Sequence, residues 1–430
     1  KAMKAQREKA RESWKGSGEE EVSDVYRNIS LKGITTDFLG YETNTEATSH
    51  VVAILKNDIE VDTLAEGERG EIFVEKTPFY GEVGGQIGDT GIIENDSSLF
   101  EVWDTQKPLD DLFTHIGKVK KGKISVGDTV LLKVDDGIRR SIEANHSGTH
   151  VLQAALKRVL GDHIKQSGSL VSHERLRFDF THFAKIEDHE LEKVESIANE
   201  YIRKNLPVST EILPIEDAMK TGATAVFDEK YGEKVRIVKM GDFSMELCGG
   251  THVLRTGDVG FLKIINESSV AAGIRRIEAV TGIEAVRHAQ KVEGELKKSA
   301  LLVKETPLKL STRIEKMLKH QRELEKEIEA LKGKLASRDS SDLVGKVKVI
   351  KGIQVLTYLV DAPDAKTLRE FGDKLRDKIK SGIILLGSKV FNISSCCACV
   401  RVRFTPPGMA KAGCTLSSPS ISMICFRPNA

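Results

Sequence analysis

The sequence predicts an α+β protein of several domains, and three observations lead to that expectation. Short β-rich runs separated by glycines fill residues 41–135, a pattern typical of a small barrel or sandwich. At Ile138 the apolar period becomes that of a helix, and strands and helices then mix up to residue 285. A long helical stretch interrupted by Pro307 follows. The 430 residues suffice for about two to four domains.

Composition and periodicity divide the chain into six segments. They are a helical linker (1–40), a β-barrel subdomain (41–137), an α+β core (138–285), a helical hairpin or coiled coil (286–340), a small α/β C-terminal domain (341–390) and an aberrant tail (391–430). The linker is assigned because residues 1–24 are highly charged with few apolar positions. The tail is assigned because no Asp or Glu follows Asp377 and no period is visible, so we expect no packed fold there.

The regular elements follow in chain order. Strands are expected at Ile72–Val74, Phe100–Trp103, Thr129–Leu132, Leu176–Phe180, Val235–Met240, Phe261–Ile265, Val347–Ile350 and Val355–Val360. Helices are expected from Ile138 to a stop at Gly161, near 187–204, and at 365–380. From Ile314 onward the apolar spacings alternate three and four, as in a coiled coil. Two interpretations stay open for 309–336: a hairpin packed on itself, or self-association of two chains.

The composition excludes some classes of protein. The chain is 40% hydrophobic and 30% charged, as in an ordinary soluble protein. The net charge of +1 means that any nucleic-acid surface must be a local patch. No apolar run approaches the roughly 20 residues that span a bilayer, so we expect no membrane partner. Five of the six cysteines follow residue 395, which favours a reducing setting over a disulfide framework.

Two pairs of residues predict a metal site. His146 and His150 are four residues apart on the predicted helix, so both imidazoles lie on one face. Cys248 and His252 repeat the spacing in a glycine-containing loop, Cys248-Gly249-Gly250-Thr251-His252. A thiolate with three imidazoles completes a tetrahedron suited to Zn²⁺. Ser147 stands where a metalloprotease would need its catalytic glutamate, so that class is rejected.

Other features predict no separate chemistry. The Gly81–Gly91 stretch lacks the Gly-Lys-Ser/Thr ending of a phosphate-binding loop and is interpreted as barrel turns. Asp179 is expected to pair with Arg177 or a nearby arginine rather than to act as a general base.

A series of longer motifs follows along the chain. They are ARESWKGSGE (10–19), TPFYGEVGGQIGDTG (77–91), NHSGTHVLQAALKRVLG (145–161), KQSGSLV (165–171), LRFDFTH (176–182), CGGTHV (248–253), FLKIINESSVAAGIRRIEAVTG (261–282) and TLREFGDKLRDKIKSG (367–382). In this order the motifs resemble alanyl-tRNA synthetases over about residues 1–390. The chain looks like the portion from the editing domain to the C-terminal domain. Gly148 departs from the family, which usually has alanine there, and the resemblance stops near Lys389.

The resemblance implies a function. Such enzymes hydrolyse serine or glycine wrongly attached to tRNA(Ala), because a synthetic pocket discriminates poorly between similar small amino acids. It implies one Zn²⁺, whereas ATP and Mg²⁺ would serve only a class II synthetic core, expected before Lys1. A cytoplasmic location is expected, with mitochondrion or plastid left open. The alternatives are a free-standing trans-editing deacylase and a non-catalytic, zinc-stabilised tRNA-binding module.

The resemblance also assigns roles to individual residues. His146, His150, Cys248 and His252 match the family's metal positions, and His150, Cys248 and Gln166 are expected to be catalytic. The residues expected at the substrate or tRNA are Gln166, Ser167, Thr149, Gly249, Gly250, Arg275 and Arg276. Among these, Arg275 and Arg276 would contact tRNA phosphates, with surface ion pairs as the alternative.

Overall fold

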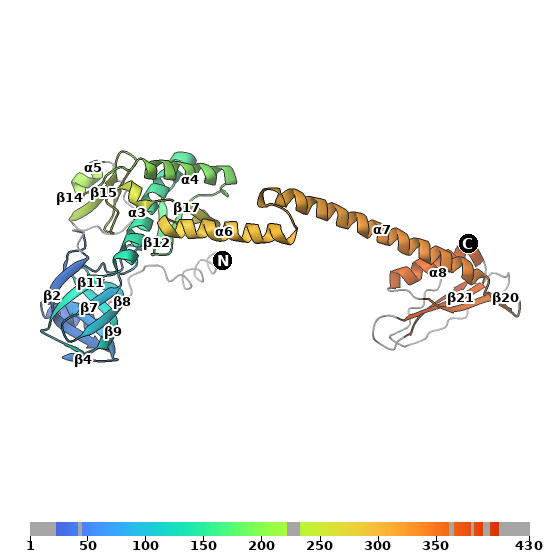
Figure 1. Cartoon of the computed structure of the whole chain (residues 1–430), viewed down its shortest axis with the longest axis horizontal. Helices are drawn as coiled ribbons and strands as arrows, with labels where there is room; N and C mark the ends of the chain where they lie inside the picture. The colour runs from blue at the N-terminus through green and yellow to red at the C-terminus, as the bar shows by residue number, and fades with distance from the viewer. Residues whose placement is uncertain are drawn as a thin grey trace, which may run out of the picture. The chain divides into compact units, whose positions relative to one another are not determined.

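The computed structural model describes residues 23–41, 45–221, 233–360, 365–379, 382–389 and 396–403. The chain forms two compact units, residues 1–294 and 295–430 (Figure 1). The first unit contains the predicted barrel and α+β core, and the second contains the predicted C-terminal domain. The predicted α+β class is therefore confirmed.

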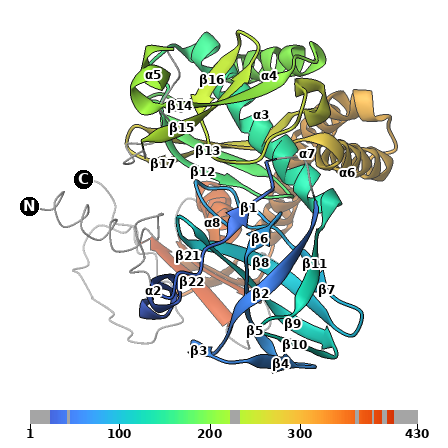
Figure 2. The same cartoon turned by 90° about the vertical axis from the view of Figure 1, so that its left-hand side faces the viewer.

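The barrel is a closed antiparallel sheet at the N-terminal end of the first unit (Figure 2). Its six strands are β2 (Glu46–Lys56), β5 (Arg69–Val74), β7 (Gly91–Glu94), β8 (Leu99–Leu109), β9 (Leu112–Lys121) and β11 (Thr129–Val134). They pair in the order β11-β7-β8-β9-β5-β2, and β11 returns to β2 to close the ring. The alternating inward residues form its core, including Val51, Ile54, Ile72, Phe100 and Leu132.

Shorter elements decorate the barrel. They are α2 (Asp24–Leu31), β1 (Asp37–Phe38), β3 (Ile59–Glu60), β4 (Thr63–Ala65), β6 (Lys76–Thr77) and β10 (Lys123–Ser125). Ile29 of α2 is buried in a small cluster with Phe73 and Leu112 on the outside of the sheet. Strand β1 pairs in parallel with β6, which places the segment 36–41 beside the glycine-rich loop that follows β6.

The α+β core is built on α3 (Asp136–Leu160). Asp135 caps its N-terminus by accepting a hydrogen bond from the Ile138 amide at 3.0 Å, and Gly161 ends it with φ of 111°. Every residue from Ala144 to Leu156 is buried, because the helix is covered on all sides. The predicted start at Ile138 was two residues late, and the predicted stop is confirmed.

Two sheets and a second helix surround α3. One sheet has the order β12-β13-β18-β17 and the other β14-β15-β16, and all their pairings are antiparallel. The elements are β12 (Gln166–Val171), β13 (Leu176–Thr181), α4 (Asp188–Arg203), β14 (Val208–Pro214), α5 (Ile215–Lys220), β15 (Lys234–Met240), β16 (Ser244–Leu247), η1 (Thr256–Val259), β17 (Lys263–Ala271) and β18 (Ile274–Val280). Leu152 and Leu156 of α3, Phe178 and Phe180 of β13 and Val194 of α4 meet in one core.

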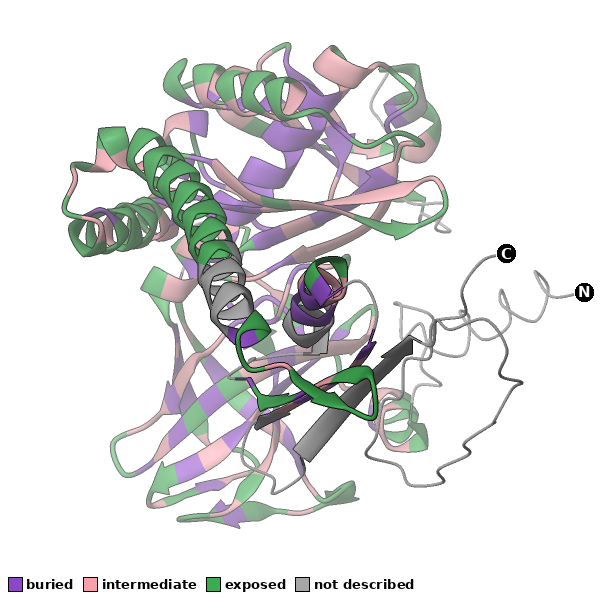
Figure 3. Ribbon diagram, turned by 90° about the vertical axis from the view of Figure 1, so that its right-hand side faces the viewer, coloured by how far each residue is buried: buried purple, intermediate pink, exposed green. Residues whose placement is uncertain are grey.

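Two long helices follow, α6 (Gly282–Leu302) and α7 (Leu310–Val344), with η2 (Pro307–Lys309) between them. The predicted interruption at Pro307 is confirmed. Figure 3 shows the described turns of α7 as largely exposed. The apolar positions of the predicted coiled-coil seam are 41–51% exposed: Ile314, Met317, Leu324, Ile328 and Leu331. Self-association through this helix stays a prediction.

The second unit ends in a small α/β domain with strand order β19-β20-β21-β22. Its elements are β19 (Lys348–Ile350), β20 (Ile353–Leu359), α8 (Ala365–Ile379), β21 (Gly382–Lys389) and β22 (Cys396–Arg403). Phe371 and Leu375 of α8 pack on Leu356 and Leu386 of the sheet. The expectation of no fold after residue 390 was wrong for β22, which pairs antiparallel with β21 through backbone hydrogen bonds that need no side-chain period. The rest of the tail, like residues 1–22, lies outside the described residues.

In the described part of the chain, no helix combines the length and apolar character needed to cross a membrane.

A buried histidine links two segments inside the barrel through hydrogen bonds. His115 of β9 is fully buried, with Nδ1 2.9 Å from the Ile72 carbonyl and Nε2 2.7 Å from the Thr77 hydroxyl. Burial lowers the pKa of His115 to about 4, from an ordinary value of 6.5. The neutral ring therefore donates a hydrogen bond from Nδ1 to the Ile72 carbonyl, and its Nε2 accepts one from the Thr77 hydroxyl.

We predict that His115 makes the first unit sensitive to acid. Because its folded pKa lies below that of the unfolded chain, its contribution is fully present above pH 6.5 and is lost as pH falls toward 4. Between about pH 6 and 5 the free energy of unfolding should fall about 1.4 kcal/mol per pH unit more steeply in wild type than in His115→Gln. Urea titrations followed by Trp103 fluorescence would measure this. Equal slopes would contradict the prediction, and the exposed His50→Gln variant is the control.

Candidate metal centre

The four residues predicted to bind a metal come together in the first unit. Helix α3 presents His146 and His150 with their rings stacked 5.3 Å apart. The loop after β16 brings Cys248 and His252 against the same face of the helix. One ligand atom from each of the four residues lies within 4.8 Å of the other three. The predicted convergence of the two pairs is therefore confirmed.

The hydrogen bonds of the imidazoles leave one nitrogen of each ring for the centre. The Nδ1 atom of each ring has a hydrogen-bond partner. His146 Nδ1 lies 2.6 Å from Gln86 Oε1, and His150 Nδ1 lies 2.6 Å from Glu246 Oε2. His252 Nδ1 lies 3.2 Å from Ser147 Oγ. The Nε2 atoms of His146 and His252 each lie 3.3 Å from the Cys248 sulfur. Partners on the distal nitrogen fix the orientation of a ring that binds a metal through the other nitrogen.

The residues present fit a metal ion. His150 Nε2 is buried and has no hydrogen-bond partner among the described residues. A buried polar atom without a partner is unfavourable, and a bound cation would remove that penalty. Three imidazole nitrogens and one thiolate form a donor set that soft and borderline divalent cations prefer.

The electrostatics of the cluster favour a thiolate. Burial opposes ionisation of Cys248, but the neighbouring His146, His252 and His150 outweigh it and hold the pKa of the thiol well below its usual value. Burial lowers the pKa of His252 to about 3, with repulsion from His146 adding to it. Burial also disfavours charge on His150, but Glu246 overrides it and raises the pKa of His150 to about 10. The shifts thus favour the anionic form of Cys248 and the basic form of His150, and they disfavour charge on His252.

The barrel supplies part of this centre. Gln86, in the glycine-rich loop between β6 and β7, is fully buried. Its Oε1 also accepts from the Thr251 amide at 3.0 Å, and its Nε2 donates to the Thr251 hydroxyl at 2.9 Å. Gly250 is required beside it, because a methyl group there would overlap the His146 ring and the Gln86 carbonyl. The loop interpreted from sequence as barrel turns therefore also holds His146 and the loop that carries Cys248 and His252.

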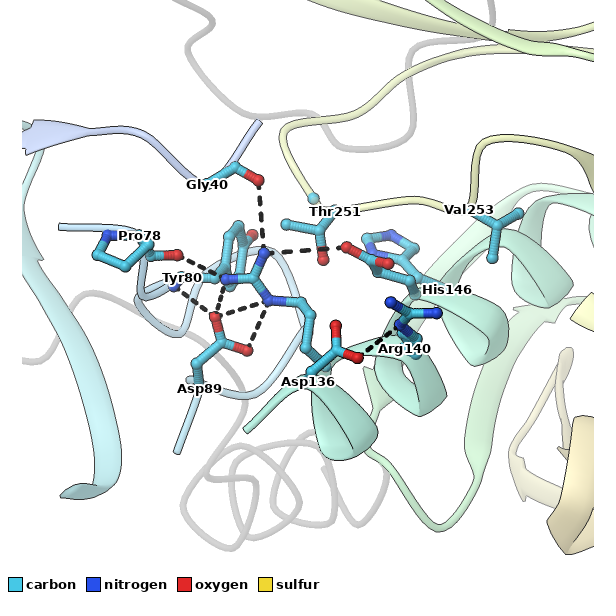
Figure 4. Close-up of polar contacts among 12 residues, drawn as sticks. Gly40, Pro78, Tyr80, Asp89, Asp136, Arg140, His146, Thr251 and Val253 are labelled. Carbon is cyan, nitrogen blue, oxygen red and sulfur yellow. Dashed lines mark hydrogen bonds and ion pairs between the residues drawn. The ribbon is translucent and has the colours of Figure 1, made fainter. Parts of the chain in front are cut away.

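A buried ion pair fixes this loop against α3. Arg139, two turns before His146, forms an ion pair with Asp89, which lies three residues after Gln86. The same guanidinium donates to the Pro78 carbonyl at 2.6 Å and the Gly40 carbonyl at 3.4 Å. Figure 4 shows Asp89, Pro78 and Gly40 close to one another beside Asp136, at the start of the helix. The barrel and helix α3 are thus joined by charge as well as by packing.

A cavity of about 530 Å³ opens beside the cluster. The polar residues that line it at this end are His146, Thr149, His150, Gln166, Ser169, Cys248, Gly249 and Gly250. Thr149 donates its hydroxyl proton to the Asn145 carbonyl at 2.9 Å, so toward the cavity this hydroxyl offers lone pairs only. The volume is in the range of pockets that bind small molecules.

The structure gathers some of the predicted substrate residues and separates others. Gln166, Thr149, Gly249 and Gly250 line the cavity. Ser167 is not among the lining residues, and Ser169 of the same strand is. A β-bulge between Gln166 and Gly168 shifts the alternation of β12, so residues 166 and 169 face the same side.

The two predicted tRNA-binding arginines lie outside the cavity on β18. Arg275 forms an ion pair with Glu267, and Arg276 pairs with Asp179 through two hydrogen bonds of 2.6 and 2.7 Å. The expected pairing of Asp179 with an arginine is therefore confirmed. Contact of either arginine with tRNA stays a prediction.

Sequence reasoning missed three residues of the centre: Gln86, Glu246 and Ser147 as partners of the metal-binding rings. A sequence signal that could have found Glu246 is its place between two apolar residues, Met245 and Leu247, only two residues before Cys248. The structure shows that this carboxylate is buried. Nothing local marked Gln86, which lies 60 residues from its partner His146.

Comparison with known families agrees with this architecture. The sequence model of the family "tRNA synthetases class II (A)" matches residues 1–138. That of the "Threonyl and Alanyl tRNA synthetase second additional domain" matches residues 235–278, from β15 to β18.

Three relatives are each described as an alanine–tRNA ligase. The protein of Acidithiobacillus ferridurans is 45% identical over 86% of this chain and 42% of its own length. The protein of Anaeromyxobacter sp. (strain Fw109-5) is 46% identical over 85% of this chain and 40% of its own length. The protein of Magnetococcus marinus is 45% identical over 90% of this chain and 44% of its own length. The chain therefore belongs to the alanyl-tRNA synthetase family, as a homologue that spans less than half the length of these relatives.

Proposed function

We propose that the first unit is a zinc-dependent hydrolase that removes serine or glycine wrongly esterified to tRNA(Ala). The observation that carries the proposal is the position of the His146–His150–Cys248–His252 cluster at the wall of a cavity that also presents Gln166 and Thr149. Homology to alanine–tRNA ligases supports tRNA as the partner. Ligation of alanine with ATP and Mg²⁺ is proposed only for the longer relatives.

The reaction would replace one bond to the ester carbonyl by another. Water adds to the carbonyl carbon, the bond to the ribose oxygen breaks, and that oxygen takes up a proton to give free amino acid and uncharged tRNA. A Zn²⁺ held by the four residues would supply positive charge that orients the substrate or polarises the groups beside it. Because four side chains fill a tetrahedron, orientation of the substrate is the role that we favour.

The cavity residues suggest how serine would be selected. The Gln166 amide can hydrogen-bond the serine hydroxyl or the ester carbonyl, and Thr149 and Ser169 add polar groups on the same wall. A site built to bond a substrate hydroxyl discriminates against analogues that lack it, such as alanine. Glycine would enter because it is small.

We predict one Zn²⁺ per chain, bound by the four-residue cluster. Metal analysis of gently purified protein should give a stoichiometry near one, and Cys248→Ala should lose most of it because the thiolate ligand is gone. Cys425→Ala, a cysteine far along the chain, should retain the metal. An unchanged zinc content in Cys248→Ala would rule out this site.

We predict that Gln86 strengthens metal binding without touching the ion. Gln86→Ala removes the acceptor that holds His146 Nδ1 and releases Thr251, so the dissociation constant for Zn²⁺ should rise roughly 10–100-fold. Competition with a chelator of known affinity would measure it. The exposed Gln321→Ala is the matched control. Equal affinities of Gln86→Ala and wild type would show that the barrel loop does not support the centre.

We predict hydrolysis of Ser-tRNA carrying the alanine acceptor stem, with Ala-tRNA left largely intact. His150→Ala and Cys248→Ala should abolish the reaction, whereas Gln166→Ala should slow it or blur selectivity while retaining zinc. Release of labelled amino acid at saturating enzyme is the measurement, with surface His163→Ala as control. If wild-type enzyme leaves Ser-tRNA as stable as buffer does, the deacylase proposal is wrong and a tRNA-binding role replaces it.

A further inference from the structure

The end of the cavity away from the metal centre is lined by aromatic side chains. Phe38, Tyr41, Tyr80 and Phe113 form this wall. The Phe38 and Phe113 rings stack with centroids 5.5 Å apart at 8°, and Tyr41 packs edge-on against Phe38 at 4.8 Å. Tyr80 and Phe113 are buried, whereas Tyr41 is 46% exposed and Phe38 is half-buried. Two aromatic groups therefore keep accessible surface in a cavity that already contains the metal ligands.

The aromatic wall is attached to the loop that carries Cys248. The Tyr41 hydroxyl donates to the Gly249 carbonyl at 2.6 Å. The Arg236 guanidinium lies 4.4 Å from the Tyr41 ring centroid and donates to the Cys248 and Gly250 carbonyls at 3.1 and 2.8 Å. A ligand on this wall would thus lie beside the metal centre, in the same cavity.

The charges at this end do not favour a simple phosphate site. Lys107 and Lys234 line the cavity, but so do Asp110 and Asp111, and Lys107 lies 3.8 Å from Asp110 in an ion pair. Arg236 is committed to two carbonyls and a ring. Exposed aromatic surface with mixed charge suits a flat, uncharged heterocycle, since nucleobases stack on aromatic side chains whatever their sequence.

We propose that the Phe38–Tyr41 wall binds the adenine of the terminal nucleoside whose ribose carries the aminoacyl ester. The inference rests on the proposed function, because the aminoacyl group and this base belong to one nucleoside. With the ester at the metal end, the base needs a neighbouring surface, and the aromatic end of the 530 Å³ cavity provides one. The barrel segment at 36–41 is then a substrate-binding element as well as a support.

Binding of adenosine 5′-monophosphate to the zinc-loaded full chain tests the wall without requiring catalysis. Phe38→Ala and Tyr41→Ala should each weaken binding about tenfold, because a stacking partner is lost. Phe183→Ala, at a 92% exposed phenylalanine outside this cavity, should bind as wild type does. Uridine 5′-monophosphate should bind more weakly, and inorganic phosphate should not compete. Absent binding, or equal competition by phosphate, would overturn the inference.

A pair of small esters separates this inference from the deacylase proposal. Wild type should prefer seryl-adenosine to serine methyl ester in kcat/KM, and Phe38→Ala should reduce that preference about tenfold. An unchanged preference in Phe38→Ala would contradict the adenine site even if both esters are hydrolysed. If neither ester is hydrolysed but adenosine monophosphate binds in a manner that depends on Phe38, the deacylase proposal fails and the adenine site stands.

Discussion

The burial of three imidazoles and one thiol within 4.8 Å is the constraint on which the rest of the first unit depends. Groups of this kind cannot all be charged or left without partners in a low-dielectric interior. In the fold, the Nδ1 atom of each ring has a hydrogen-bond partner, and the partners come from Gln86, Glu246 and Ser147. What remains is a set of donor atoms that face one another, among which His150 Nε2 has no hydrogen-bond partner in the described part of the chain and could bind a cation.

Meeting this constraint requires the barrel and the α+β core to act as one body. Gln86 comes from the barrel, and the Asp89–Arg139 ion pair holds its loop against α3. Breaking a buried ion pair by removing one partner leaves an uncompensated charge, so this contact also specifies how the two parts meet. Gly250 also allows this close packing, since any side chain there would displace Gln86 or His146.

The same junction shapes the cavity. Its metal end is formed by α3, β12 and the loop after β16, and its aromatic end comes from the segment 36–41 and the barrel. A small-molecule site assembled from two structural parts can divide recognition between them, with one part positioning the reacting group and the other the rest of the ligand. The hydrogen bond from Tyr41 to the Gly249 carbonyl connects the aromatic end of the cavity to the loop that carries Cys248.

The sequence by itself determined the four residues of the cluster, the long helices and part of the strands. Short β-rich runs between glycines marked barrel strands, a helical period marked α3, and i, i+4 spacing put His146 and His150 on one face, all of which follow from local sequence and backbone geometry. Local geometry could not place Gln86 60 residues from His146 or Tyr41 208 residues from Gly249. It also missed the bulge that turns Ser169 rather than Ser167 to the cavity, and the strand β22. Only the tertiary structure decided these contacts, because they depend on barrel closure and strand order, which no local period encodes.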